Sequence, residues 1–495
     1  MSTVATTNKK LTAYPFLTIF SIFLMFGFGY VVKPWSTVTD MGVKIIGVYL
    51  GVLLMLICTK ETIWPPILGM FALLCHRYAT ASAMLQNWMG NSTVVMLLFI
   101  LALCGALKES GAPIVMANYL MTRKITRGRP GLFLFMLFLA TTILSMLTSG
   151  TASILMMYQV AGGLVDACGY DRDSKEHKFI LLGIYISNIG AYMLPFKGIH
   201  LSTLAVATGI MESYGVEFNS LLYLLACCFT VVIFLILFIL LMKTVFKCDL
   251  KPLANVDTSN LKGLSESGTK LNTRQALLFG AFLFGIVVLL IQMFLPKSSA
   301  VNQFLSSIGS TWPWIVIFCL LCIPHMKDGK SFINGSILLR DNAMWGTVCM
   351  IACISMCGQA MSNADYGIRD WLLKVFTPIL GNMSFVTMVI AVAVFCTILT
   401  QFLNGSPIAY VLNTICMPFA CMLELEGKGN ATAVCSTIVF CCFFAFVTPA
   451  ASSLAPLITG HPNMTTKFLW TKGWIYTAVW IVVAAVVFAF FGFIF

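Results

Sequence analysis

Long uninterrupted apolar runs are the feature that most constrains this chain. Runs such as Leu221–Met242 and Ala276–Leu295 contain about 20 residues, the length that a helix needs to cross roughly 30 Å of hydrocarbon. In lipid only helices and closed barrels satisfy the backbone hydrogen bonds, and these runs lack the strict alternation of barrel strands. The composition agrees, with 59% hydrophobic and 10% charged residues among 495. The sequence therefore predicts an all-α polytopic membrane protein with about 11 spans.

The positive charges lie between the apolar runs. A formal net charge of +12 is also found in nucleic-acid-binding proteins, but here the basic residues gather at 123–129 and from Lys243 to Arg274. Such clustering is typical of cytoplasmic loops between spans. We therefore expect a multi-pass protein of the plasma membrane, surrounded by the lipid bilayer, with its N-terminus inside the cell and no nucleic-acid partner.

A polar stretch near the middle of the chain predicts a division into two halves. Residues 247–274 are rich in Ser, Asn, Lys and Asp, a composition typical of a linker. The predicted organisation is an N-terminal span at 1–42, a first transmembrane repeat at 43–246, a cytoplasmic linker at 247–274, and a second transmembrane repeat at 275–495.

Short segments of the first half recur in the second half at nearly one offset. The matched pairs are Thr142–Thr151 with Thr397–Ser406, Ala191–Pro195 with Ala445–Pro449, and Leu103–Gly105 with Met356–Gly358, at offsets of 255, 254 and 253 residues. An ordered set of matches indicates two related repeats. If each repeat crosses the membrane an odd number of times, the second is inverted, an arrangement in which transporters place the substrate between the halves. Inversion is a hypothesis, because the number of crossings is open.

Both halves interrupt an apolar run with small polar residues at matching positions. The interruptions are Thr148–Thr151 in the first half and Asn404–Pro407 in the second. Gly and Pro weaken a continuous helix. A broken helix at membrane depth is tolerated only inside protein or beside a watery cavity, where its N-terminus attracts anions and its free carbonyls bind cations. We predict a binding site at these breaks; the alternative is a simple packing kink.

A second stretch that contains Pro follows each break, and these stretches resemble segments of a known transporter family. The stretches are Ser187–His200 and Thr448–Ser453, and both hold Pro within apolar surroundings. The chain resembles the divalent anion:sodium symporter family, within the ion transporter superfamily, over nearly its whole length. Asn188–Gly190 matches the family's glycine-rich stretch, and Ser149–Thr151 and Asn404–Ser406 match its paired Ser-Asn-Thr signatures. Ala445–Gly460 matches its Thr-Pro stretch. Gly90–Thr93 and Leu103–Gly111 match its first re-entrant hairpin.

The resemblance implies a fold with broken helices and re-entrant hairpins, a homodimer, elevator-like motion, and carriage of di- or tricarboxylates. In the family the two signatures bind the substrate carboxylates and help to form two sodium sites. This sequence departs from the pattern, since Gly150 and Gly405 occupy the two Asn positions and Pro195–His200 lacks the double proline. The predicted substrate-binding residues are Ser149, Gly150, Thr151, Asn404, Gly405, Ser406, Pro407, Ser452 and Ser453. The predicted ion-binding or coupling residues are Thr148, Asn188, Gly190, Lys197, His200, Thr448 and Pro449.

Two ionisable residues near the first break allow more than one interpretation. Lys197 lies within an apolar run, where its ammonium would either replace a sodium ion or pair with an anionic substrate. Alternatively, Lys197 ends a helix and extends to the membrane interface. His200 either couples protons or is a packed polar residue. No cofactor is expected apart from sodium as a possible coupling ion, and no other metal is expected.

Residues that other classes of protein require are missing. We find no HExxH motif, no cluster of acidic residues for metal-bound phosphate and no Walker A motif, so we do not expect an enzyme or an ATP-driven pump. No Asp or Glu lies at the centre of a clear apolar run, which disfavours a carboxylate proton relay and a cationic substrate. The sequence therefore predicts a secondary active transporter of small organic anions, as a cation-coupled symporter or an anion exchanger. An anion channel and a transporter of inorganic oxyanions such as sulfate or arsenite are the alternatives.

Overall fold

The computed structural model is helical throughout the residues that it describes. These are residues 4–59, 61–122, 124–148, 150–195, 200–255, 270–294, 299–309, 311–324, 331–343, 345–381, 383–449, 451–452 and 454–495. In this part of the chain the one pairing of extended backbone is an isolated bridge between Pro324 and Ser331. The predicted all-α fold is therefore confirmed.

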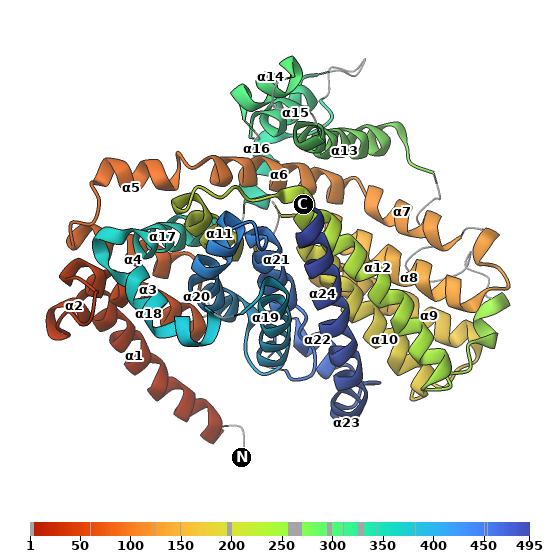
Figure 1. Cartoon of the computed structure of the whole chain (residues 1–495). Coiled ribbons are helices and arrows are strands. Elements are labelled where there is room, and N and C mark those ends of the chain that lie inside the picture. The colour runs from red at the N-terminus through yellow and green to blue at the C-terminus, as the bar shows by residue number, and fades with distance from the viewer. Residues whose placement is uncertain are drawn as a thin grey trace.

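Four helices on the right of Figure 1 form what we call the first helix group. They are α8 (Pro130–Leu147), α9 (Gly150–Cys168), α10 (Lys175–Ser187) and α12 (Ser220–Thr244). The local sequence explains where these helices begin. Pro130 is in the first turn of α8, where its missing backbone N–H would have no partner within the helix anyway. The side chains of Ser174 and Asn219 accept hydrogen bonds from the first turns of α10 and α12.

A second helix group of four helices lies in the centre of the molecule. It consists of α19 (Phe385–Thr400), α20 (Gly405–Leu425), α21 (Ala431–Cys442) and α24 (Trp474–Ile494). Helix α24 packs along α12 of the first helix group, and aromatic side chains fill the seam. The ring of Phe238 stacks on that of Tyr476 at 4.1 Å, and Phe234 meets Trp480 edge to face at 5.2 Å. Close aromatic packing holds the two groups together, since lipid supplies no hydrophobic force between helices.

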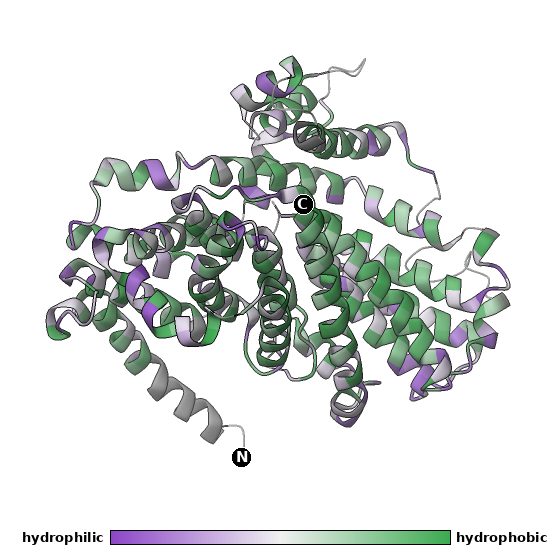
Figure 2. Cartoon of the chain, viewed as in Figure 1, coloured by the Kyte–Doolittle hydropathy of each residue, from purple (hydrophilic) through white to green (hydrophobic). Residues whose placement is uncertain are grey.

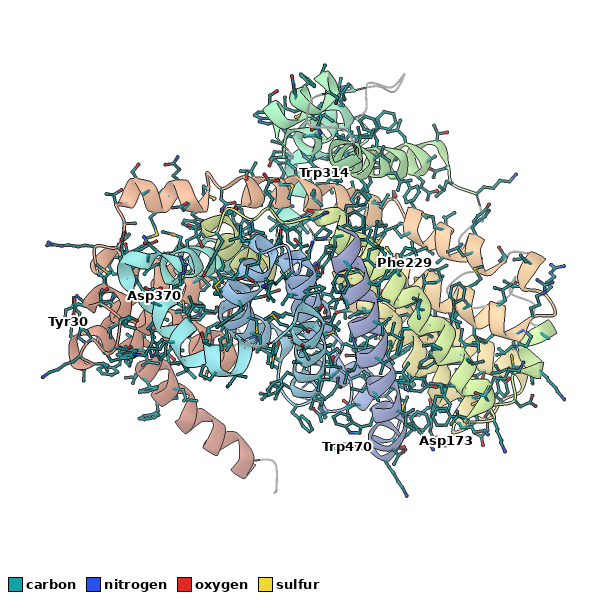
Figure 3. All side chains as sticks on the ribbon, in the orientation of Figure 1. Tyr30, Asp173, Phe229, Trp314, Asp370 and Trp470 are labelled. Carbon is teal, nitrogen blue, oxygen red and sulfur yellow. The ribbon has the colours of Figure 1, made fainter. Side chains whose placement is uncertain are left out.

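The other helices surround these two groups (Figure 1). Helices at the left of the view are α1 (Val4–Phe26), α2 (Phe28–Val31), α3 (Asp40–Thr59), α4 (Trp64–Cys75), α5 (Ala81–Trp88), α17 (Trp345–Ser362) and α18 (Ile368–Leu380). Across and above the top lie α6 (Ser92–Glu109), α7 (Ala112–Met121), α13 (Thr273–Phe294), α14 (Ala300–Ile308), α15 (Trp312–Cys322) and α16 (Gly335–Asn342). Trp314 of this upper layer (Figure 3) is buried against Phe282 of α13 at 5.7 Å. Helix α11 (His200–Ser213) packs against both α17 and α20.

The helices have the length and composition of membrane spans. Among the described residues, five helices are long and apolar enough to cross a bilayer, or up to seven if each of two bent helix pairs counts as one span. One bent pair is α6 with α7, which turn by 63° at Gly111, whose φ is +72°. Figure 2 shows hydrophobic residues along the helices and hydrophilic residues gathered at their ends. The chain is a multi-pass integral membrane protein; the count of about 11 spans stays a prediction.

Candidate functional site

The first predicted break lies between α8 and α9. The hydroxyl of Thr148 donates to the backbone oxygen of Leu144 at 2.6 Å, which ends α8. Helix α9 begins at Gly150, directly beside the buried side chain of Asn188. A Cβ atom added at Gly150 would lie 2.8 Å from Asn188 Nδ2, closer than real Cβ atoms approach. Glycine therefore leaves room for the Asn188 side chain to pack directly against the helix start.

The second predicted break lies between α19 and α20. Asn404 caps α20, since its side-chain oxygen accepts a hydrogen bond from the Ser406 backbone at 3.1 Å. A Cβ atom at Gly405 would lie 2.7 Å from the carbonyl carbon of Cys442 and closer still to its oxygen. The hydroxyl of Thr400 holds that same oxygen with a 2.6 Å hydrogen bond. The absence of a side chain at residue 405 thus allows two backbones to meet.

The two breaks make corresponding contacts. Gly150 packs against Asn188, and Gly405 packs against Cys442; the glycines are 255 residues apart and their partners 254. These are the offsets at which the sequence segments match. The two contacts therefore occupy corresponding positions along the chain, while the two repeats and their boundaries stay a prediction. The close packing of another segment against each glycine gives a physical reason for glycine where the resembling family has Asn.

A buried glutamine that the sequence analysis did not single out fixes the second break. Gln401 lies at the end of α19 and is completely buried. Its Nε2 donates to the backbone oxygens of Phe444 (2.6 Å) and Thr397 (3.1 Å). Its Oε1 accepts from the backbone N–H groups of Phe446 (3.1 Å) and Val447 (3.2 Å). One amide side chain therefore forms hydrogen bonds with the backbone of the non-helical segment after α21, whose buried N–H and C=O groups would otherwise have no partner.

A second residue that the sequence analysis missed, Tyr185, links the two helix groups. From α10 its hydroxyl donates to the backbone oxygen of Ala445 at 3.0 Å and lies 3.1 Å from Ser452 Oγ. Because the tyrosine proton is committed to Ala445, the Ser452 hydroxyl is the donor in the second bond. Ser452 Oγ in turn accepts from the backbone N–H groups of Leu454 (3.3 Å) and Ala455 (3.0 Å). The hydrogen-bond directions in this network are thus fully determined.

A narrow pocket lies where these networks meet, with a volume of about 20 Å³, which is room for about one water molecule. Its lining includes Tyr185, Asn188 and Tyr192 from the first half, and Phe443 and Ser452 from the second. The rings of Tyr192 and Phe443 stack at 4.3 Å and form an aromatic wall. Two predicted site residues, Asn188 and Ser452, thus line the same pocket.

The polar side chains of the pocket are uncharged, and one of them supplies a donor. Asn188 Oδ1 accepts a hydrogen bond from the Ser153 hydroxyl at 3.2 Å, which leaves Asn188 Nδ2 as a donor. Gly150 and the exposed Thr151 form the first turn of α9 directly beside Asn188, and a helix start carries partial positive charge. None of the described lining residues carries a charge. The arrangement therefore favours an anion without holding a fixed opposite charge.

The other predicted residues lie at or near these contacts, with three exceptions. Thr448 donates its hydroxyl to the backbone oxygen of Gln401, Gly190 packs against the backbone of Thr142, and Ser406 and Pro407 form the first turn of α20. Pro449 is exposed. Ser149, Lys197 and Ser453 lie outside the described residues.

His200 lies behind the aromatic wall of the pocket. It is completely buried at the start of α11, where Nε2 lies 2.8 Å from the backbone oxygen of Leu194. Its ring packs against those of Tyr192 at 5.6 Å and Phe443 at 6.1 Å. His200 thus supports the pocket wall, and its role in proton coupling stays a prediction.

Broken apolar helices around a buried pocket are typical of secondary transporters of the membrane. The family model of the citrate transporter (CitMHS) matches residues 52–439, which run from α3 to α21, so the chain belongs to the citrate transporter family. Both breaks and Asn188 lie inside the matched range, whereas Ser452 lies beyond it. No curated protein matches the chain in sequence.

Solved transporter structures share the fold. The chain is similar to the Alcanivorax borkumensis YdaH transporter, with a TM-score of 0.54 and 13% identity over 82% of this chain and 86% of that one. It is also similar to Neisseria gonorrhoeae MtrF, from a class of antimetabolite efflux pumps, with a TM-score of 0.54 and 13% identity over 86% and 85%. The family match and the shared fold confirm the predicted resemblance to the divalent anion:sodium symporter family.

Proposed function

We propose that the protein carries citrate or related di- and tricarboxylates across the membrane, and that the substrate binds between Asn188 and Ser452 in a conformation in which this pocket is wider. The observation that carries the proposal is the uncharged lining contributed by both halves beside the start of α9, with Asn188 Nδ2 as a donor. Membership of the citrate transporter family supports the same class of substrate. The described lining residues include no carboxylate that would repel a polyanion.

Asn188 provides a direct test of the sign of the substrate charge. Asn188→Asp is nearly isosteric but places a carboxylate where we propose that a substrate carboxylate binds, so KM for citrate should rise at least tenfold, the equivalent of about 1.4 kcal/mol. A site for a cationic substrate would instead bind more tightly. Asn334→Asp is the matched control, because Asn334 is an exposed helix cap on α16 and Asp caps helices as well as Asn.

The measurement is uptake of labelled citrate into proteoliposomes that contain the purified full-length chain. Unlabelled di- and tricarboxylates should compete, whereas sulfate and arsenite should not. Saturable uptake with counterflow is expected for a carrier; a flux that never saturates would indicate an anion channel. Competition by sulfate alone, or unchanged KM in Asn188→Asp, would refute the substrate assignment.

The same proteoliposome assay tests how transport is coupled to ions or to exchange. Imposed sodium and proton gradients, each applied alone, should reveal whether a cation drives uptake, and citrate trapped inside the vesicles should reveal exchange. We propose cation-coupled symport or anion exchange, with sodium as a candidate coupling ion. Cross-linking in the membrane tests the homodimer that the family resemblance implies.

A further inference from the structure

A second pocket lies on the membrane-facing side of the first helix group, far along the helices from the breaks. It is a groove between the start of α8 and the end of α12, with a volume of about 400 Å³ that is open to the surface. Leu132 and Phe135 line one side, and Ile236 and Leu240 line the other. Both helices are long and apolar enough to cross a bilayer, so the groove opens toward lipid.

The α12 side of the groove continues an exposed apolar stripe. Phe229, Ile233, Ile236 and Leu240 follow one another at helical spacing, and between 37% and 52% of each side chain is exposed. Figure 3 labels Phe229 near the upper end of this stripe. An apolar stripe on a span is ordinary lipid contact, but the groove beside Ile236 and Leu240 adds a recess that an acyl chain can fill.

The groove ends at a lysine, and other basic residues lie next to it. Lys243 is exposed in the last turn of α12 and lines the groove. Among the described residues it has no acidic partner. The exposed Arg127 and Arg129 directly precede α8. The backbone between these two arginines is held in place by a 2.9 Å hydrogen bond from the Gly128 N–H to the Ala254 oxygen.

Acidic residues at this end of the first helix group have partners of their own. Glu176 accepts a hydrogen bond from the Asp249 backbone at 3.0 Å and lies 4.0 Å from Lys175. Asp166 pairs with Arg172 at 2.8 Å. The groove itself is lined by Lys243 and by no carboxylate among the described residues, so its complementary partner is an anion attached to an apolar chain.

We propose that this groove is a binding site for an anionic phospholipid, with one acyl chain along Leu132, Ile236 and Leu240 and the headgroup phosphate at Lys243 and Arg129. Basic pockets between membrane helices select anionic headgroups, and each basic residue contributes about 1 kcal/mol. A zwitterionic lipid would fill the same recess, but its headgroup carries no net charge to pair with Lys243 and Arg129. A second copy of the chain would cover the stripe but would meet an unpaired lysine.

Native mass spectrometry of the full-length protein tests the site by titration with phosphatidylglycerol and, separately, with phosphatidylcholine of the same acyl chains. The wild type should bind phosphatidylglycerol more tightly. Lys243→Gln should weaken phosphatidylglycerol binding about fivefold, the equivalent of about 1 kcal/mol, and leave phosphatidylcholine unchanged. Leu240→Trp, which fills the groove, should weaken the binding of both lipids. Lys108→Gln is the matched control, since Lys108 is also exposed in the last turn of an apolar helix.

Three outcomes would overturn the proposal. Equal affinity of the wild type for both lipids would remove the headgroup preference. Unchanged phosphatidylglycerol binding in both Lys243→Gln and Leu240→Trp would place the lipid elsewhere. Loss of a dimer mass in Leu240→Trp, with lipid binding intact, would identify the groove as an interface between two copies. Thermal unfolding of each variant without added lipid shows that the variants are folded.

Discussion

Gly405→Ala is the substitution that most directly tests the close approach at the second break. The added methyl group would lie 2.7 Å from the carbonyl carbon of Cys442 and nearer to its oxygen. Both atoms are backbone, so relief requires the segment after α21 to retreat on the order of 1 Å. That movement also pulls the Cys442 oxygen away from the Thr400 hydroxyl, which holds it at 2.6 Å.

Two effects determine how much Gly405→Ala lowers the free energy of unfolding. Overpacking a tight site costs about 1–3 kcal/mol, and one lost buried hydrogen bond costs about 0.5–1.5 kcal/mol. Gly405→Ala should therefore lower the free energy of unfolding by about 2–4 kcal/mol. Gly150→Ala should be milder, because the nearest atoms, 2.8 and 2.9 Å away, belong to the end of the Asn188 side chain, which can rotate.

Thermal unfolding of the purified protein in one detergent, followed by tryptophan fluorescence, measures the difference. Gly162→Ala is the matched control: it lies inside α9, and a Cβ added there meets nothing within 4 Å. This control should be neutral or stabilising by about 0.5–1 kcal/mol. The reasoning is refuted if Gly405→Ala unfolds at the wild-type temperature, or if Gly162→Ala is the more destabilised variant.

Two further substitutions test the contacts around the pocket, and a third tests a pair of histidines that does not line it. Tyr185→Phe should cost about 1–3 kcal/mol, because it leaves the Ala445 oxygen without its donor; a wild-type thermal midpoint would contradict this. Gln401→Met should cost about 2–5 kcal/mol in the same measurement, since it strands two buried backbone N–H groups and one oxygen, and full stability would show that water replaces the amide. The third concerns His461: burial lowers its pKa, and His177, with ring centroids 6.3 Å apart, lowers it further. The folded protein therefore binds fewer protons than the unfolded chain, so stability should fall as pH drops through about 6.5. His461→Gln should flatten this fall in unfolding temperatures between about pH 8 and pH 5, and an unchanged slope would exclude His461 as its source.

The helical fold and the location of the breaks were predictable from the sequence. Apolar runs of spanning length leave few alternatives in lipid, and glycine among small polar residues inside such a run indicates a backbone that must bend or be approached closely. Gly150 and Gly405 do lie where one helix ends and the next begins. The functional roles assigned to the residues at the breaks stay predictions.

The residues that link the segments were not predictable. A tyrosine inside an apolar run, such as Tyr185, is ordinarily a packing residue, and only the fold brings its hydroxyl to Ala445, 260 residues away. Gln401 was missed for a related reason. Its counterpart in the first half, at the offset of 255 residues, is Met146, so comparison of the halves gave no sign of a polar role. Contacts between distant segments depend on tertiary packing, which local patterns do not report.

The hydrogen bonds of Gln401 have a consequence for the energetics of binding. Unwound backbone at membrane depth ordinarily recruits water, ions or a ligand. Here the Gln401 side chain itself supplies those partners, and it fastens the segment to the end of α19. A molecule that enters the pocket therefore loses little binding free energy to ordering this wall. Selectivity on this side depends on shape and donor position, because the wall is already formed before the molecule arrives.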